Sequence, residues 1–116
     1  MNICIAVNYR TIFRPCTLEK FYVHTSLNRN VGLIRIFPSM TTDLVKTFLQ
    51  PPIEGVVLQS YGTGNVPSNR EDIIKELSAA TKRGVIIVNI TQCSTGHVSN
   101  LYEPSKFLSD AGTVYN

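Results

Sequence analysis

The sequence predicts an α/β fold: a parallel sheet of about four strands, flanked by helices in three layers and preceded by an irregular β segment. Short apolar runs rich in β-branched residues alternate with segments of helical periodicity. The connections between them are mostly two to six residues long. This alternation is typical of βαβ units, in which consecutive strands run parallel. It is regular from about Val31 onward.

The composition describes one globular domain. At 116 residues, 43% hydrophobic and 16% charged, the chain can bury a core and is too apolar to be disordered. The net charge is +3 and the basic residues are scattered, which argues against a nucleic-acid partner. No apolar run approaches the ~20 residues of a membrane span, and the opening residues lack the basic flank of a signal peptide. We therefore expect neither nucleic acid nor membrane as a partner.

Three cysteines occur, Cys4, Cys16 and Cys93. An odd number cannot all pair with one another, and the spacing matches no zinc motif. The simplest interpretation is reduced thiols in a cytoplasmic protein.

Residues 1–27 are expected to form an irregular linker, and residues 28–116 an α/β domain. In the linker, alternating apolar residues predict one short strand around Ile3–Val7, and an aromatic and β-branched run predicts another at Phe21–Val23.

The domain then begins with a strand over Val31–Phe37, which Pro38 ends. Thr41 or Thr42 can cap the next helix, which Pro51 stops. Its predicted inner face consists of Leu44, Val45, Phe48 and Leu49.

The second half repeats the pattern. A buried strand is expected over Gly55–Ser60, followed by a glycine turn and a helix from about Asn69 to Arg83. Ser68 and Glu71 have the spacing of a capping box. The next predicted elements are a central strand over Val85–Ile90, a short helix from Pro104 to Gly112, and a strand that starts at Thr113.

The turn Gly62–Pro67 imitates the start of a dinucleotide-binding fingerprint. The third glycine is missing, Pro67 stands where the loop should pass under a pyrophosphate, and no acidic residue ends the next strand. Nucleotide binding is therefore disfavoured against a turn that simply connects strand to helix.

A polar loop, Thr91–His97, follows the central strand at the same edge of the sheet. It brings a thiol, hydroxyls and an amide to the edge where ligands bind in α/β folds. Cys93 and His97 form a possible nucleophile and base, but the sequence offers no third group to orient them. A binding loop is the better interpretation, and residue patterns alone indicate only a small-ligand-binding or interface domain.

Two segments together resemble one family. Val56–Pro67 and Arg83–Val98, in this order and separation, are similar to the C-terminal domain of cytosolic, type I L-asparaginases. Residues 28–38 and 48–50 also fit, so the resemblance covers most of the chain from about Asn8. It implies a Rossmann- or flavodoxin-like α/β domain, cut off here before its last helices.

The family's enzymes are homo-oligomers, dimers or tetramers, of two-domain subunits. They hydrolyse L-asparagine to aspartate and ammonia, without a metal or another cofactor. Their catalytic threonines lie in the N-terminal domain, and no segment here matches the nucleophile motif Thr-Gly-Gly-Thr. The resemblance therefore implies no catalytic residue in this chain, an N-terminal domain as its partner, and no activity of the chain alone.

The resemblance also implies contacts with ligands. Asn65 and Tyr102 match positions that approach the substrate bound to a neighbouring subunit. Thr91 and Cys93 match positions of an allosteric asparagine site, which Gln59 and Ser60 are expected to face. At Gln59 the bacterial enzyme has an arginine, and glutamine lacks the charge that would hold the effector's carboxylate.

Three hypotheses follow. The first is the C-terminal domain of an L-asparaginase, which contributes intersubunit and allosteric residues. The second is a stand-alone, non-catalytic binding or interaction domain. The third, an enzyme based on Cys93, requires an unusually reactive thiol.

Overall fold

The computed structural model describes residues 7, 9, 12, 18, 20–67, 69–96, 98 and 108–115. Its centre is one sheet in which β1 (Val31–Arg35), β2 (Gly55–Ser60), β3 (Ile86–Thr91) and β4 (Val114–Tyr115) lie in the order of the sequence. All neighbouring pairs are parallel. The predicted α/β fold is confirmed, with three strands of five or six residues and a two-residue fourth.

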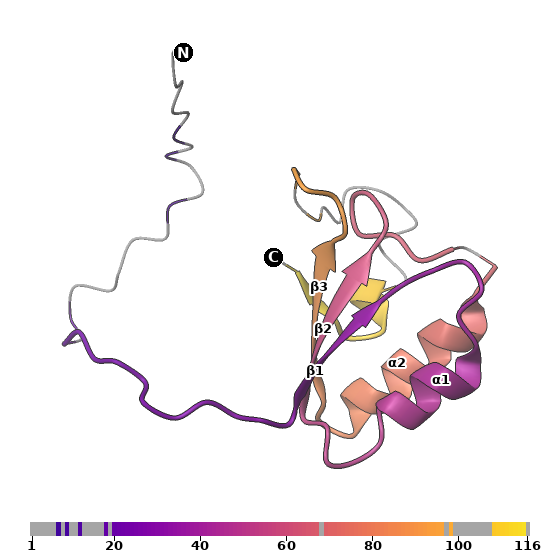
Figure 1. The fold of residues 1–116 in the computed structure, drawn as a ribbon, viewed down its shortest axis with the longest axis horizontal. Coiled ribbons are helices and arrows are strands. Elements are labelled where there is room, and N and C mark those ends of the chain that lie inside the picture. Colours follow the sequence, from indigo (N-terminus) through magenta and orange to yellow (C-terminus); the bar gives the residue numbers. More distant parts are fainter. Residues whose placement is uncertain are drawn as a thin grey trace.

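Both labelled helices lie on one side of this sheet, to its right in Figure 1. They are α1 (Thr42–Phe48) and α2 (Glu71–Lys82). Strands added in one direction by right-handed crossovers place every crossover on the same face, and only a reversal of strand order would bring a helix to the other face. The described strands show no reversal. The described residues thus form two layers, and the predicted third layer has no counterpart among them.

Helix α1 begins as the sequence predicts. The Thr41 hydroxyl accepts a hydrogen bond from the backbone N–H of Leu44 at 3.3 Å, which satisfies one free donor of the first turn. Val45 and Leu49 are buried, but Leu44 is 46% exposed, so its predicted place on the inner face is wrong.

Helix α2 starts at Glu71 after Arg70, which makes no side-chain cap. The predicted capping box involves Ser68, which lies outside the described residues. Arg70 instead donates to the Asp72 carboxylate and, at 2.6 Å, to the carbonyl of Met40. The Thr42 hydroxyl donates to the same carboxylate. This network joins the first turns of the two helices. The predicted Glu71–Lys75 ion pair is present at 3.9 Å but is exposed and contributes little.

The core lies between the sheet and the two helices. Its side chains are nearly all of one kind, aliphatic and less than 5% exposed, and they include Ile34, Val56, Leu58, Val45, Leu49, Ile73, Leu77 and Ile87. Gly32 faces the same side, and a Cβ there would stand 2.4 Å from the Phe48 ring. A glycine is needed at this position because the ring of α1 rests directly on β1.

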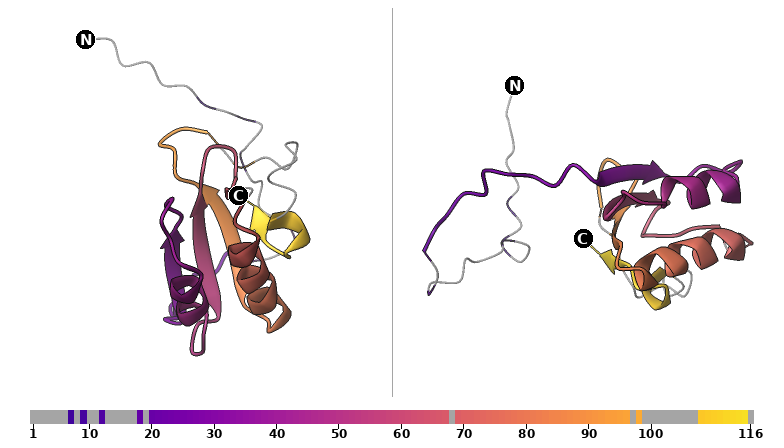
Figure 2. Two further views of the ribbon diagram at one scale, coloured as in Figure 1. Left: turned by 90° about the vertical axis from the view of Figure 1, so that its right-hand side faces the viewer. Right: turned by 90° about the horizontal axis from the view of Figure 1, so that it is seen from below.

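The described part of the N-terminal segment contains no strand. Residues 20–30 form no helix or strand, and Phe21, Tyr22 and Val23 are 64–94% exposed. The predicted strand at Phe21–Val23 is therefore wrong, because its backbone has no neighbouring strand to bond. The other predicted strand, around Ile3–Val7, lies outside the described residues except for Val7. Figure 2 shows the segment leading away from the sheet.

The chain returns to the core near its end. Residues 108–110 are helical, Leu108 and Ala111 are buried as predicted, and Gly112 has φ +87°. Thr81 of α2 donates to the Ala111 carbonyl at 2.6 Å, which holds this segment beside α2. The start of the predicted helix, residues 104–107, lies outside the described residues.

Candidate functional site

The glycine turn leaves the carboxyl end of β2 and closes on itself. The backbone N–H groups of Gly64 and Asn65 both donate to the Tyr61 carbonyl, at 2.9 and 2.8 Å, and the Tyr61 N–H donates to the Asn65 carbonyl at 2.8 Å. Gly62 and Gly64 have φ angles of +48° and +112°. Because two of its amides are already bonded internally, the turn does not offer them to a phosphate, which agrees with the weak dinucleotide fingerprint.

A buried polar pair lies directly beneath the turn. The Ser60 hydroxyl donates to Asn89 Oδ1 at 2.6 Å, and both residues are 0% exposed. Asn89 Nδ2 donates in turn to the Gly64 carbonyl at 3.2 Å. A Cβ on Gly64 would stand 3.2 Å from this amide and 2.4 Å from Val98, so only glycine fits between them.

Sequence reasoning missed Asn89. It is an amide within the apolar run Val85–Ile90, two positions after Ile87, which points to the core. A polar residue on the buried face of a strand must find a hydrogen-bond partner, and this alternation was the signal that could have found it.

Thr91, at the end of β3, holds the turn from the neighbouring strand. Its hydroxyl donates to the Gly62 carbonyl at 2.6 Å and accepts the Cys93 N–H at 3.1 Å. Its one proton is therefore committed to the turn.

Gln92 ties three strand ends together. Its amide donates to the carbonyls of Ile36 and Gln59, at 2.6 and 2.8 Å, and its Oε1 accepts Arg35 Nε at 3.3 Å. Arg35 pairs with Gln59 in the β1–β2 register, so their Cα atoms are neighbours. In the described part of the chain, Arg35 takes part in no salt bridge.

The structure separates two of the predicted site residues. Ser60 alternates with Val56 and Leu58 on the helix-covered face and is fully buried, whereas the half-buried Gln59 lies on the opposite face. The expectation that both face one pocket is therefore wrong, because consecutive strand residues point to opposite faces. Ser60 supports Asn89 instead.

The other predicted residues lie at the carboxyl edge or outside the described residues. Cys93 is a free, exposed thiol next to the bonded Thr91. Asn65 is half-buried, and its Oδ1 is buried with no hydrogen-bond partner among the described residues, as is the Tyr61 hydroxyl. Tyr102 and His97 are outside the described residues, and so are Cys4 and Cys16.

The two carboxylates with shifted pKa values lie at opposite ends of the sheet: Asp72 is in the first turn of α2, which follows the carboxyl end of β2, and Glu54 immediately precedes β2. The hydrogen bond from Arg70, followed by that from Thr42, holds the pKa of Asp72 far below its ordinary value of 3.8. Hydrogen bonds from Asn28 and then Asn30 lower the pKa of Glu54. These carboxylates are stabilised in their charged form and brace loops. They are therefore poor acids or bases at neutral pH.

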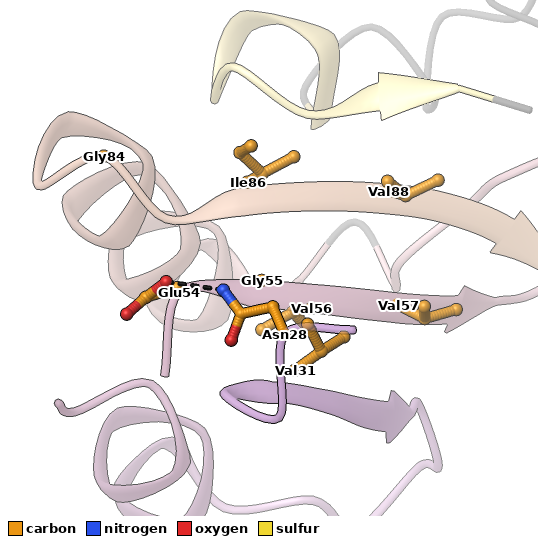
Figure 3. Close-up of a pocket in the computed structure, with 9 residues that line it drawn as sticks. All are labelled: Asn28, Val31, Glu54, Gly55, Val56, Val57, Gly84, Ile86 and Val88. Carbon is orange, nitrogen blue, oxygen red and sulfur yellow. Dashed lines mark hydrogen bonds between the residues drawn. The ribbon is translucent and has the colours of Figure 1, made fainter. Parts of the chain in front are cut away.

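An apolar groove of about 480 Å³ runs along the uncovered face of the sheet. Figure 3 shows Val31, Val57, Ile86 and Val88 along this face, with Asn28 bonded to Glu54 at one end. The groove lies toward the amino ends of the strands, away from the glycine turn. Among the described residues it is sheet surface without a covering layer, and the carboxylate that lines it, Glu54, is held by Asn28 and Asn30.

Among the described residues, no group of three or more His, Cys, Asp or Glu side chains is placed to hold a metal ion. None of the helices described is long and apolar enough to cross a bilayer.

Comparison with known proteins decides the family. Residues 30–116 match the Glutaminase/Asparaginase C-terminal domain. The chain belongs to this asparaginase family. The resemblance drawn from the two sequence segments is thereby confirmed at the family level.

Individual relatives agree with this asparaginase assignment. The L-asparaginase of Dirofilaria immitis is 53% identical over 114 residues, 98% of this chain and 19% of that protein. The 60 kDa lysophospholipase of Homo sapiens is 42% identical over 95% of this chain and 19% of that protein. The crystal structure of L-asparaginase I from Vibrio cholerae superposes with a TM-score of 0.69 at 34% identity, over 76% of this chain and 27% of that one. The chain thus spans about a fifth to a quarter of these relatives' length.

Proposed function

We propose that this chain acts as the C-terminal, partner-facing domain of a cytoplasmic, homo-oligomeric L-asparaginase. An N-terminal domain supplies the catalytic residues, and the chain by itself does not hydrolyse L-asparagine. Asn65 and Tyr102 contact the substrate bound to a neighbouring subunit.

The observation that carries the site is the side chain of Asn65. It sits on a turn held by internal hydrogen bonds, and its Oδ1 is buried with no partner among the described residues. A buried acceptor without a partner costs free energy, and a donor from a substrate or a second subunit can satisfy it once the side chain turns outward. The ammonium group of asparagine is such a donor.

The uncovered face weighs against the stand-alone alternative. Parallel sheets are usually covered on both faces, and here Val31, Leu33 and Ile86 are 50–63% exposed. In the proposed function, other parts of the complete enzyme cover this face.

A regulatory role is the second part of the proposal, and it assigns Thr91, Cys93 and Gln59 to an effector site for L-asparagine at the carboxyl edge of the sheet. Thr91 is the register partner of the buried Ser60, and Gln59 lies on the opposite face, so a ligand meets both only beyond the strand ends, where the loop after Thr91 passes Gln59. Gln59 provides no cation, but Arg35 is its register partner on the adjacent strand. Its guanidinium, bonded only through Nε to Gln92 within the described residues, is free to hold the effector's carboxylate through its terminal nitrogens.

A chimera tests the enzymatic proposal. This chain replaces the matching segment of the Dirofilaria immitis L-asparaginase, and ammonia release from L-asparagine is measured. We expect activity in the chimera, none in the isolated chain, and a loss of at least about tenfold in kcat/KM for Asn65→Ala. Asn69→Ala is the matched control, because Asn69 is exposed four positions further along. A folded, oligomeric chimera without activity would refute the proposal.

Calorimetry tests the regulatory part. In the chimera, Arg35→Gln should weaken effector binding, and adding Gln59→Arg to that variant should restore it by returning the cation to the neighbouring strand. Equal affinity for L-asparagine in the chimera, its Arg35→Gln variant and the double variant would exclude Arg35 as the ligand of the effector's carboxylate. Strong binding of asparagine by the isolated chain would support the stand-alone alternative.

A further inference from the structure

The end of β3 holds the glycine turn at two points. Thr91 bonds the Gly62 carbonyl at 2.6 Å, and Asn89 bonds the Gly64 carbonyl at 3.2 Å. Gly62 and Gly64 are the two residues of the turn with positive φ, so both bonds act where the backbone turns most sharply. Asn65 follows directly.

We propose that Asn89 and Thr91 are positioning residues, which hold the glycine turn, and with it Asn65, in one conformation. This inference rests on the proposed function only in the role that it gives the turn, which is to present Asn65. The two hydrogen bonds to Gly62 and Gly64 do not depend on that function. Neither residue touches substrate in this proposal.

The environment makes the Asn89 bond firm. Asn89 is fully buried, its Oδ1 is occupied by the Ser60 hydroxyl, and its Nδ2 points to the turn. A buried amide with its acceptor satisfied on one side has a fixed orientation, so it can direct its donor to one place. Ser60 thus acts on the turn through Asn89.

Thr91 connects two features that the proposed function treats separately. Its hydroxyl bonds both the Gly62 carbonyl and the Cys93 N–H. Thr91 and Cys93 are proposed effector positions, and Gly62 belongs to the turn that carries Asn65. A ligand that competes for the Thr91 hydroxyl would therefore release one of the two bonds on the turn.

Amide hydrogen exchange of the chain, followed by NMR, tests the positioning role without an activity assay. The Gly64 and Asn65 amides are protected by their bonds to the Tyr61 carbonyl, so their exchange reports opening of the turn. Thr91→Val keeps the shape of the side chain and removes the hydroxyl. Thr91→Ser keeps the hydroxyl.

The control is Thr81→Val, which removes another threonine-to-carbonyl bond of 2.6 Å, on α2 and remote from the turn. We expect Thr91→Val to raise exchange at Gly64 and Asn65 roughly fivefold, the loss of about one hydrogen bond. Thr91→Ser should restore slow exchange, and Thr81→Val should leave the turn's exchange unchanged. An equal increase in Thr91→Val and Thr81→Val, or none in Thr91→Val, would overturn the proposal.

Asn89→Leu removes the second bond and should raise the same exchange more, since it also removes the shorter of the two hydrogen bonds of the buried Ser60 hydroxyl. If that variant does not fold, the comparison of Thr91→Val with Thr91→Ser still tests the proposal. The chimera separates the two proposals. A turn that opens in Thr91→Val without any change in kcat or KM would uphold positioning and refute the role of Asn65.

Discussion

The two faces of the sheet carry similar side chains but lie in different surroundings. On the helix-covered face, Ile34, Leu58 and Ile87 are 0–4% exposed. On the other face, Leu33 and Ile86 are 56% and 63% exposed. Hydrophobic composition therefore did not decide which face is buried here. The order of the strands and the hand of their connections decided it.

The largest contrast is expected between two leucines on neighbouring strands. Leu58→Ala opens a cavity under the helices and should lower the free energy of unfolding by about 2–5 kcal/mol. Leu33→Ala, at a half-exposed position, should cost less than about 1 kcal/mol. Urea denaturation of both variants measures the difference. Equal losses would mean that something covers the second face in solution.

Two glycines provide a smaller contrast. Gly32→Ala forces the Phe48 ring of α1 away from β1 and should cost about 1–3 kcal/mol in thermal or urea unfolding. Gly55→Ala is the matched variant, because its Cβ would come no closer than 3.3 Å, to a methyl of Val31. We expect it to be near neutral. A cost at Gly55 as large as that at Gly32 would contradict the close contact assigned to Phe48.

Acid should destabilise the contact between the first turns of α1 and α2. The pKa of Asp72 is lowered in the folded chain, so its carboxylate stabilises the fold above its ordinary value of 3.8. That contribution is lost as the pH falls through and below this value. Asp72→Asn should therefore reduce stability at neutral pH and make it depend less on pH in the acid range. The pKa of Glu54 is also lowered in the folded chain, so part of the pH dependence of stability should remain in this variant. If Asp72→Asn leaves the dependence of the unfolding free energy on pH unchanged, the Arg70–Asp72–Thr42 network does not stabilise the fold.

The smallest effect on stability is expected on the uncovered face. Ile86→Lys places a charge at a position that is 63% exposed, and should change the unfolding free energy of the chain by less than about 0.5 kcal/mol. In the chimera the same change should disrupt packing and lower activity or solubility. If the chimera tolerates it fully, this face is not covered in the enzyme.

Much of the fold could be predicted because the signals are local. The alternation of β-branched runs with helical periods located β1 to β3, α1 and α2 to within about two residues, and Thr41 was among the predicted caps. The strand at Phe21–Val23 failed because propensity does not supply a pairing partner. The prediction for Leu44 failed because the buried face of α1 is narrower than its apolar stripe: Val45 and Leu49 are buried, whereas Leu44 is 46% exposed.

The site was predictable in position but not in its contacts. The glycine turn and the Thr91 loop come together because parallel strands end at the same edge. That Ser60 and Gln59 face opposite sides follows from strand alternation, whereas the Asn89 and Thr91 bonds to the turn depend on the β2–β3 register. No short-range pattern encodes that register.

By itself, the sequence determined the α/β class, the elements, the family and the glycine turn, because each depends on neighbouring residues or on motifs read along the chain. The tertiary structure alone decided which face is covered, that Arg35 lies beside Gln59, and that β3 fastens the turn before Asn65. These contacts join residues that lie 24 to 29 positions apart in the chain. They form only when right-handed crossovers bring parallel strands into register.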